Sequence, residues 1–430
     1  MAERRFERPS RVDRPRCRRV PHRILAGRPA ARAGVRAPPR AGLPRVRAGD
    51  GIHVRIVLHD RAPFRSRHIV RHTAPEVLLG AAYVAGLPAS WRTGGGLIMS
   101  DAADDAVGRF SSMLGRLRVS VTHACQLHCK FCHQEGIQSH WRPIHMSVGT
   151  FDRLVDAFVE IGGYEIDVTG GDPLVHPEIA GILRVLGGRR LRRALCTNGL
   201  LLDRVVPELE AGCVDEVKIS VHASDDSVGK ALLGRAWSSA RLDGMLLLLQ
   251  QIGVPTTMNF SVTSENFGEF DAVLEKSFEM GTNLLVIDLI GTRWDLQQEE
   301  LCDTSSDPII EKLSSLSTLS SVTRDRTGCR ISVFKGPGGQ RWMVKDVRNG
   351  LLFTGMCNGC ALKKRCGEGV FVLRVDAEGA FRPCLIRPDL EVVHPIEHMG
   401  STSLRSALEE RIGVMMAEPC AFEAGQSIYT

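Results

Sequence analysis

Short apolar segments alternate with longer amphipathic ones from about residue 116 onward, and this alternation limits the chain to a few α/β folds. The apolar, β-branched segments predict six strands, Leu117–Val121, Glu165–Thr169, Arg193–Thr197, Val217–Val221, Thr257–Val262 and Leu284–Ile290. The segments between them predict helices, among them Val148–Ile161, Ile179–Leu186, Leu202–Ala211, Met245–Ile252 and Phe267–Met280. Strands that alternate with helices imply parallel βα units. We expect a partial (β/α)6 barrel of the TIM type, with a doubly wound open sheet as the alternative.

The charge of this 430-residue chain is distributed unevenly along its length. Residues 1–98 contain 21 Arg, no Lys and only 6 Asp or Glu, so they carry +15 while the remainder carries −9. Such a composition cannot build a core, so we expect this segment to be disordered or to precede a natural start at Met99. A basic arm that binds nucleic acid and a targeting leader are the alternatives.

The remaining residues are enough for two domains of ordinary size. We assign residues 99–295 to the barrel and residues 296–430 to a smaller, cysteine-rich C-terminal domain, because the alternation fades after about residue 291. No run of about 18 apolar residues occurs, so we expect no membrane span.

Three cysteines directly follow the first predicted strand. Cys125, Cys129 and Cys132, here called the first cysteine group, have the spacing C-x3-C-x2-C. They fall at the edge of a βα sheet where such folds place active sites. Three thiolates can bind three irons of a [4Fe–4S] cluster and leave the fourth iron open to a ligand. A zinc site is the alternative, and the candidates for its fourth ligand are His123, His128 and His133.

Four further cysteines, here called the second cysteine group, lie near the C-terminus: Cys357, Cys360, Cys366 and Cys384. Their spacing fits either a structural zinc site or a second iron–sulfur cluster. The chain has 13 cysteines in all, and their clustering in a chain of this length indicates metal binding in a reducing compartment. We therefore expect a cytoplasmic protein.

The first cysteine group resembles the cluster motif of the radical S-adenosylmethionine (SAM) enzymes, and the segment Thr169-Gly-Gly-Asp-Pro173 is similar to their Gly-Gly-Glu-Pro loop. Asp172 stands where Glu is usual. The resemblance implies a [4Fe–4S] cluster whose open iron chelates SAM, and reductive cleavage of SAM to a 5′-deoxyadenosyl radical. It also implies SAM contacts at the ends of the predicted strands, from Phe131, Gly170, Gly171, Asp172, Thr197, Asn198, Ser220 and Leu289.

Within this superfamily, residues 116–390 most resemble the GTP cyclase group of molybdenum-cofactor biosynthesis. The matching segments are Leu117–Cys125, Cys132–Gly136, Val168–Leu174 and Cys196–Leu201. That group holds an auxiliary cluster with three cysteines and binds substrate at the open iron. The resemblance therefore implies an auxiliary [4Fe–4S] cluster on Cys357, Cys360 and Cys384. Cys366 lies in about ten extra residues that the cyclase group lacks, and it is a candidate fourth ligand. The first three cysteines of the second group also resemble the auxiliary-cluster domain of peptide-modifying radical SAM enzymes.

The basic residues with which the cyclase group grips GTP are only partly present. Arg118 matches one of them, whereas Asp167 and Thr257 stand where the group has arginine and lysine. Asp167 would place like charge against a triphosphate. We therefore expect Arg118 to contact a small-molecule substrate of cofactor or natural-product biosynthesis, with GTP and a peptide as the alternatives.

The resemblance also implies an external electron donor of the flavodoxin or ferredoxin type, because no flavin or nicotinamide fingerprint is visible. A zinc protein whose basic arm binds nucleic acid is the alternative from another functional class. The arm lacks interleaved aromatic residues, and this absence argues against a nucleic-acid partner.

Overall fold

The computed structural model describes residues 105–133, 143–288, 306–318, 320–323 and 328–424. All of these described residues belong to one compact unit. Three predictions lie outside the described residues: the disorder of residues 1–98, the domain boundary at residue 296 and the SAM contact Leu289.

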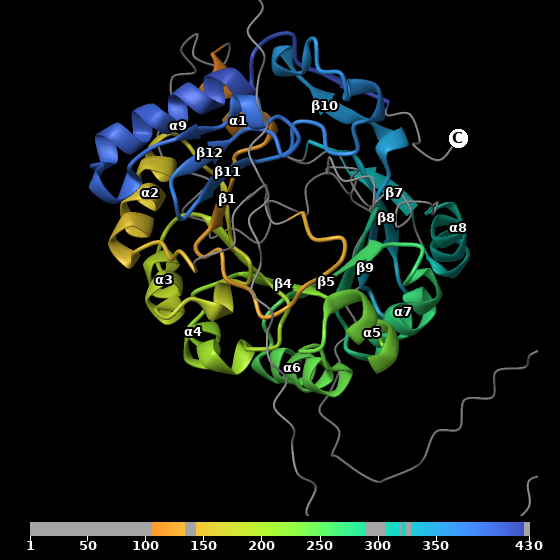
Figure 1. Cartoon of the computed structure of the whole chain (residues 1–430). Helices are drawn as coiled ribbons and strands as arrows, with labels where there is room; N and C mark the ends of the chain where they lie inside the picture. The colour runs from red at the N-terminus through yellow and green to blue at the C-terminus, as the bar shows by residue number, and fades with distance from the viewer. Residues whose placement is uncertain (1–104, 134–142, 289–305, 319, 324–327, 425–430) are drawn as a thin grey trace, which may run out of the picture. The chain divides into compact units, whose positions relative to one another are not determined.

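A twelve-stranded sheet runs through this unit in the order β13-β12-β11-β1-β2-β3-β4-β5-β6-β9-β8-β7. Its first six strands in the chain are β1 Arg116–Ser120, β2 Glu165–Thr169, β3 Arg192–Thr197, β4 Glu216–Ser220, β5 Thr256–Val262 and β6 Asn283–Asp288. Each of them pairs in parallel with the next. The strands curve around an interior and the helices stand outside them (Figure 1). The predicted partial barrel is confirmed, since a doubly wound sheet would carry helices on both faces.

Helices cover the outer face of the sheet. They are α1 Ala106–Met113, α2 Val148–Glu160, α3 Ile179–Leu186, α4 Val206–Glu210, α5 Asp226–Leu233, α6 Ser239–Ile252, α7 Phe270–Glu279, α8 Asp307–Leu316 and α9 Ser401–Met415. In α2, the Ser147 hydroxyl caps the helix by accepting from the Thr150 amide at 3.1 Å. Phe151, Leu154 and Phe158 fall on one face of α2 and are fully buried. Each such side chain contributes about 1.5–3 kcal/mol by leaving water.

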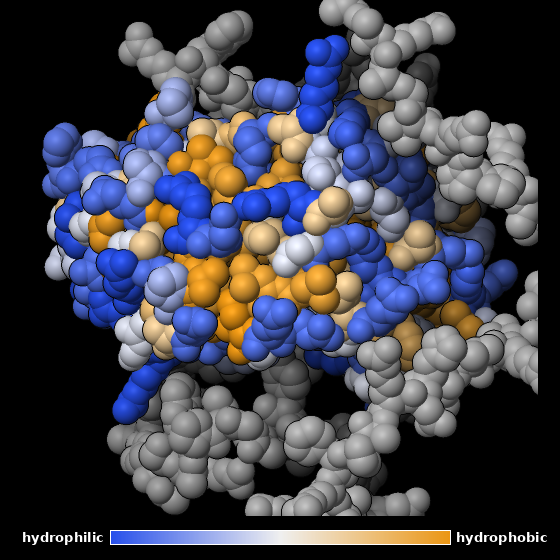
Figure 2. All heavy atoms as spheres, turned by 90° about the horizontal axis from the view of Figure 1, so that it is seen from below, coloured by the Kyte–Doolittle hydropathy of each residue, from blue (hydrophilic) through white to orange (hydrophobic). Residues whose placement is uncertain are grey.

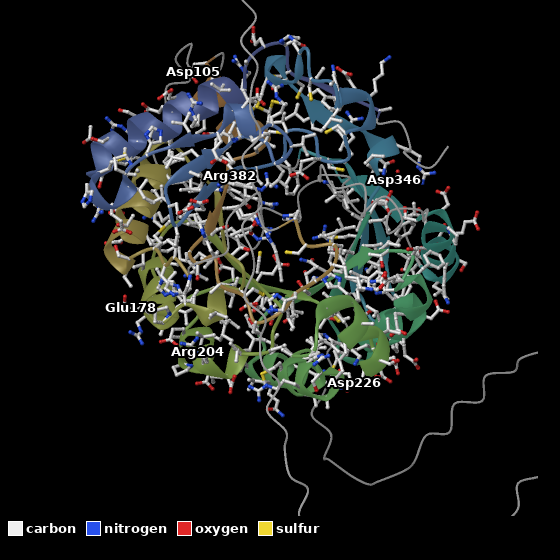
Figure 3. The ribbon with its side chains drawn as sticks, viewed as in Figure 1. Asp105, Glu178, Arg204, Asp226, Asp346 and Arg382 are labelled. Carbon is white, nitrogen blue, oxygen red and sulfur yellow. The ribbon has the colours of Figure 1, made fainter. Side chains whose placement is uncertain are left out.

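The inner face of the barrel is charged, because successive residues of a strand point to opposite faces. On β1, Leu117 and Val119 belong to the apolar core. Arg116 and Arg118 of the same strand form ion pairs with acidic residues of β2. Figure 3 shows many side-chain nitrogen and oxygen atoms inside the ring of strands, and its labelled Arg382 lies near this inner region.

The C-terminal segment extends the same sheet at both edges. Its strands are β7 Ser320–Thr323, β8 Ile331–Lys335, β9 Arg341–Lys345, β10 Leu351–Phe353, β11 Leu373–Asp376, β12 Ala380–Arg382, β13 Val392–Val393 and β14 Ala421–Glu423. Strand β11 pairs in parallel with β1, and β9 pairs in parallel with β6. Strands β10 and β14 form a separate antiparallel pair. The parallel part of the sheet therefore contains two strands that the sequence pattern did not predict.

The outer surface is mixed in polarity. Figure 2 views the molecule from the side on which α4 and α6 lie, and apolar residues gather in the middle of this face among polar ones. Leu247 of α6 is one of the exposed large apolar side chains. Within the described part of the chain, no helix has both the length and the apolarity needed to cross a membrane.

Candidate functional site

The first cysteine group lies in the loop that leaves the carboxyl end of β1. All three side chains are partly exposed. The Cys125 sulfur accepts from the Leu127 amide at 3.4 Å and lies 3.9 Å from the Asn198 side-chain amide nitrogen. The loop thus reaches the end of β3, and Asn198 is placed where the sequence predicted a contact with the cofactor region.

The protonation of these thiols fits a cationic ligand. Burial raises the pKa of Cys125 to about 12 and raises that of Cys129, and the neighbouring thiols add to both shifts. A thiol binds metal as the thiolate, so a cation must displace the proton. Buried thiols that repel one another when ionised are the donor set that a cluster of positive irons stabilises.

Gly170 and Gly171 allow the loop after β2 to pack directly on the backbone that leads into the first cysteine group. A Cβ on Gly170 would lie 2.4 Å from the Thr122 carbonyl oxygen, and one on Gly171 would lie 2.4 Å from that of Ala124. The Gly171 amide donates to Thr122 at 2.8 Å. The two glycines are therefore required where one loop touches the next.

Asp172 joins the ends of β2 and β3 from a fully buried position. Its carboxylate accepts from the Thr197 hydroxyl at 2.8 Å, the Asn198 amide at 2.7 Å and the Leu174 amide at 3.0 Å. Burial raises the pKa of Asp172, and these donors oppose that shift. The structure thus brings three of the predicted SAM contacts, Asp172, Thr197 and Asn198, into one hydrogen-bonded unit.

Phe131 of the first cysteine loop packs against the segment that follows β4, where Ser220 is the last residue of the strand. The Phe131 ring packs edge-on against His222, two residues beyond Ser220, with ring centroids 4.8 Å apart. Burial lowers the pKa of His222 to about 4, so its ring is neutral at pH 7. The His222 Nδ1 accepts from the Ser261 amide at 3.0 Å. The sequence analysis did not single out His222, because a lone histidine after a strand carries no distinctive signal.

The inner charged network lies below this edge. The Lys218 ammonium contacts Glu165 at 2.9 Å and Asp167 at 2.7 Å, and Arg118 lies 3.6 Å from Asp167. Burial alone would raise the pKa of Asp167, yet Lys218 and the two arginines of β1 hold it well below its usual range. Asp167 is therefore an ionised and matched charge. From the sequence alone, we expected the Asp167 charge to repel an anionic substrate. Because Lys218 and Arg118 pair with Asp167, that repulsion is no longer a reason to exclude such a substrate.

The second cysteine group lines one pocket. Its walls are Phe353, Met356, Cys357, Cys360, Lys363, Cys366, Gly369, Cys384, Ile386 and Arg387. The Cys366 sulfur accepts from the Gly369 amide at 3.2 Å. Burial raises the pKa of Cys384 to about 12 and also raises that of Cys366. Amide hydrogen bonds to sulfur are a feature of iron–sulfur sites, and the structure brings Cys366 to the same pocket as the other three.

The two cysteine groups lie at opposite ends of the inner face. The first group follows the carboxyl end of β1, and β11 runs parallel beside β1 with Leu373 next to Leu117. Strand β12 runs back antiparallel, with Arg382 next to Arg374. Cys384 comes two residues later, so it lies beyond the amino end of β11. The inner charged network therefore lies between the two groups.

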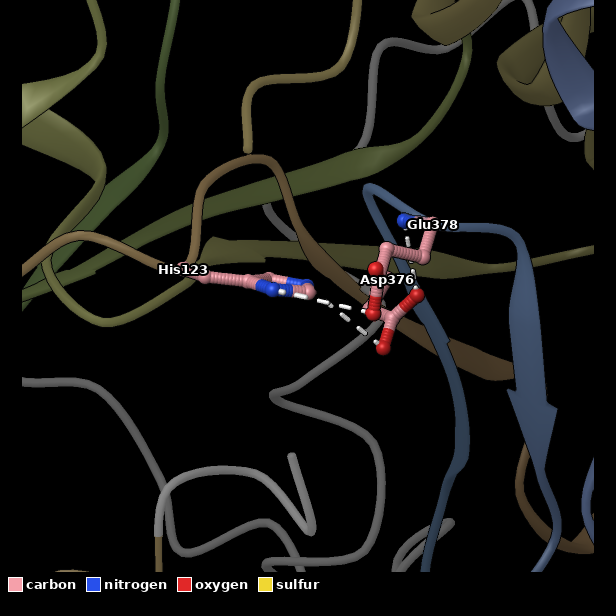
Figure 4. Close-up of side chains that lie close together, drawn as sticks. All are labelled: His123, Asp376 and Glu378. Carbon is pink, nitrogen blue, oxygen red and sulfur yellow. Dashed lines mark hydrogen bonds and ion pairs between the residues drawn. The ribbon is translucent and has the colours of Figure 1, made fainter. Parts of the chain in front are cut away.

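The sulfur spacing bears on the choice between zinc and iron–sulfur. Around tetrahedral zinc, with bonds of about 2.3 Å, neighbouring sulfurs stand about 3.8 Å apart. In the part of the chain that the structure describes, no three cysteine sulfurs lie within 4.8 Å of one another. His123, a candidate fourth zinc ligand, instead points its ring toward Asp376 and Glu378 (Figure 4). The direction of the His123 ring therefore argues against this residue as a fourth zinc ligand of the first cysteine group.

Comparison with known families indicates the class of the protein. Residues 119–276 match the family model described as Radical SAM superfamily. This segment of the chain is similar to radical SAM domains. The matched segment begins within β1 and ends within α7, so it covers the first cysteine group and strands β2 to β5. This match supports SAM and an iron–sulfur cluster as the cofactors of the barrel.

Curated relatives of this chain include proteins named probable GTP 3′,8-cyclase. That of Sulfurisphaera tokodaii is 24% identical over 310 residues, which cover 70% of this chain and 91% of the relative. That of Thermococcus kodakarensis is 26% identical and covers 65% and 87%. Among solved structures, Streptococcus suis SuiB aligns with a TM-score of 0.48 at 14% identity, covering 72% and 67%. AnSMEcpe with bound AdoMet aligns with a TM-score of 0.45 at 13% identity, covering 67% and 79%.

Proposed function

We propose that the first cysteine group holds the [4Fe–4S] cluster that binds SAM, that the second group holds an auxiliary [4Fe–4S] cluster, and that a small-molecule substrate binds between them. The observation that carries this proposal is the placement of two cysteine groups at opposite ends of one charged inner face. When bound and reduced, the first cluster supplies the electron that breaks a carbon–sulfur bond of SAM and leaves a 5′-deoxyadenosyl radical, which removes a hydrogen atom from the substrate. A flavodoxin- or ferredoxin-type protein supplies that electron.

The chain's own residues hold SAM and orient it. The backbone around Gly170 and Gly171 faces the methionine part, because these glycines bring the loop against the first cysteine group. Asp172 keeps this loop in register with Asn198 at the end of β3. Phe131, braced by the neutral ring of His222, packs against adenine. Ser220 and Leu289 complete the SAM contacts.

The second cluster is closed in this proposal, because four cysteines line its pocket. Four thiolates satisfy all four irons of a cubane cluster and leave none open to substrate. A cluster held by these four cysteines would supply electron transfer and no substrate-binding iron, so protein side chains would bind the substrate. Arg118 is the first of these, since its side chain is partly exposed on the inner face and lies beside Asp167.

GTP cyclisation is the second candidate function. The relatives named GTP 3′,8-cyclase favour it, and so do Arg118 and Lys218 on the inner face. Because Lys218 and Arg118 neutralise Asp167, this carboxylate does not face an anionic substrate as an unmatched negative charge. A peptide substrate is the remaining alternative.

The test uses the full chain, purified and reconstituted with iron and sulfide without oxygen. Iron is counted, and SAM, dithionite and either GTP, a substrate-free buffer or a peptide pool are added. We expect about eight irons per chain. A small-molecule substrate raises the yield of 5′-deoxyadenosine, and Arg118→Ala raises the substrate concentration needed. Stimulation by peptides alone would contradict the small-molecule proposal, and about four irons per chain would contradict the second cluster.

A further inference from the structure

His123 is a buried histidine whose ring has no hydrogen-bond partner. The residue is 5% exposed, and both of its ring nitrogens are buried without such a partner. The ring points toward two carboxylates of the turn between β11 and β12 (Figure 4). Its Nε2 lies 3.6 Å from Asp376 and its Nδ1 lies 4.0 Å from Glu378. These distances are too long for hydrogen bonds, and an unpaired buried imidazole costs free energy unless something else binds it.

The Asp376 carboxylate is held in place by its surroundings. One oxygen accepts from the amides of Glu378 at 2.9 Å and Ala380 at 3.0 Å, and the other accepts from Arg382 at 2.6 Å. Burial alone would raise the pKa of Asp376, but the facing His123 side chain, Arg382 and the Ala380 amide hold it at about 2, so Asp376 is ionised at pH 7. A carboxylate oxygen has two lone pairs, and the one that Arg382 does not use is free to face His123.

The acidic side chains around His123 outnumber the basic ones, and this excess of negative charge favours a bound cation. Asp376, Glu378 and Glu391 are acidic, and Arg382, which pairs with both Asp376 and Glu391, is the basic residue among them. Without His123, these side chains sum to −2. The Glu378 side chain is 46% exposed, so it can rotate to meet an incoming ion. A divalent cation would neutralise the group and give the histidine its missing partner.

We propose that His123, Asp376 and Glu378 bind one divalent metal ion through an imidazole nitrogen and two carboxylate oxygens. The three ligand atoms lie within 4.8 Å of one another, so the Glu378 rotation alone brings them close to the spacing that bonds of about 2.0–2.2 Å require. Nitrogen and oxygen ligands suit Mn²⁺, Fe²⁺ or Zn²⁺, and this site contains no thiolate. Arg382 and the two amides orient the Asp376 ligand from behind.

The position of this proposed metal site indicates a role in substrate binding. His123 lies two residues before Cys125, and the β11–β12 turn lies at the same carboxyl edge of the parallel strands. Three protein ligands leave coordination positions open to an outside group. The ion would therefore bind an oxygen anion of a substrate, such as a carboxylate or phosphate, at the edge where SAM binds. The site is separate from both cysteine groups, so it does not depend on the auxiliary cluster.

Manganese is the probe, because Mn²⁺ is a hard ion that avoids thiolates and leaves the cysteine groups alone. The full chain, with its iron–sulfur clusters in place and without oxygen, is titrated with Mn²⁺. The electron paramagnetic resonance (EPR) signal of free Mn²⁺ then reports the bound amount. We expect one tight site per chain. Glu378→Gln should weaken it tenfold or more, and so should His123→Asn.

The control is Glu409→Gln, which removes a carboxylate of similar exposure on α9 and should leave the affinity unchanged. Glu378 is a surface side chain, so its variant keeps the proposal testable even where His123→Asn fails to fold. The iron content of each variant shows that the cysteine groups are intact. Wild-type protein without a tight site, or a Glu378→Gln variant that binds Mn²⁺ as tightly as the wild type, would overturn the proposal.

Discussion

Replacing Lys218 with methionine tests the inner charged network. Lys218 neutralises Glu165 and Asp167, both with side chains only 2% exposed. When the Lys218 ammonium is removed, Glu165 still forms an ion pair with Arg116 at 2.9 Å. Asp167 then has only the more distant ion pair with Arg118 at 3.6 Å. Breaking a buried pair in this way typically costs about 3–5 kcal/mol, because an uncompensated charge stays buried. At about 2 °C per kcal/mol for a unit of this size, the apparent melting temperature should fall by roughly 6–10 °C.

The pKa of Asp167 predicts how the stability difference between Lys218→Met and the wild type changes with pH. In the wild type the pKa of Asp167 is lowered, so its stabilisation is present above the unfolded value of about 3.9 and is lost as the pH falls through the folded value. In Lys218→Met the unpaired carboxylate has a raised pKa in the folded state. Its penalty is full at neutral pH and is relieved as the pH falls through that raised value. The stability gap between variant and wild type should therefore shrink from pH 7 toward pH 4.

Thermal unfolding of anaerobically prepared protein at several pH values is the assay. Lys230→Met is the matched control: Lys230 pairs with Asp226 at 2.7 Å, but both side chains are 47% exposed, so no resolvable change is expected. An unchanged melting temperature for Lys218→Met, or a gap that widens in acid, would refute the reasoning.

Two further substitutions probe the two cysteine groups. Gly171→Ala places a Cβ 2.4 Å from the Ala124 carbonyl oxygen and must displace the loop that leads to the first group, so SAM cleavage should fall at least tenfold. Gly244→Ala, on α6 in open space, should cleave SAM at the wild-type rate. Cys366→Ser removes one of the four thiols that line the second pocket. The iron content should therefore fall from about eight toward about four irons per chain when a chelator is added. Cys420→Ser should retain about eight irons, and equal loss from both cysteine variants would contradict a role for Cys366.

The sequence predicted the barrel strands well, because apolar, β-branched residues recur in each of them and helices separate them in the chain. Strands β9 and β11 escaped prediction, since neither lies between two α-helices of the chain. Their neighbours β6 and β1 lie far away in the chain. A partial barrel leaves β1 and β6 with unpaired edges, and β11 and β9 pair with these edges. No local sequence pattern shows such long-range pairing.

Some residues of the candidate site could likewise be found from the sequence, and others only from the structure. The cysteine spacings and the Gly-Gly-Asp-Pro loop are local patterns, so they could be found from the sequence. The inner charges could also have been found, because Arg116-Leu-Arg-Val and Glu165-Ile-Asp-Val alternate charged and apolar residues with the period of a strand. His123 and Asp376 could not be paired in this way, because only the parallel register of β1 and β11 brings them together.

The central claim is that the two cysteine groups have different tasks at the two ends of the inner face. The most direct measurement is the yield of 5′-deoxyadenosine from SAM and dithionite without oxygen, for the wild type, Cys129→Ser and Cys360→Ser, each with its iron content. We predict product from the wild type, none from Cys129→Ser, and substrate-independent product still formed by Cys360→Ser. No product from iron-loaded wild type, or equal product from Cys129→Ser, would contradict the account.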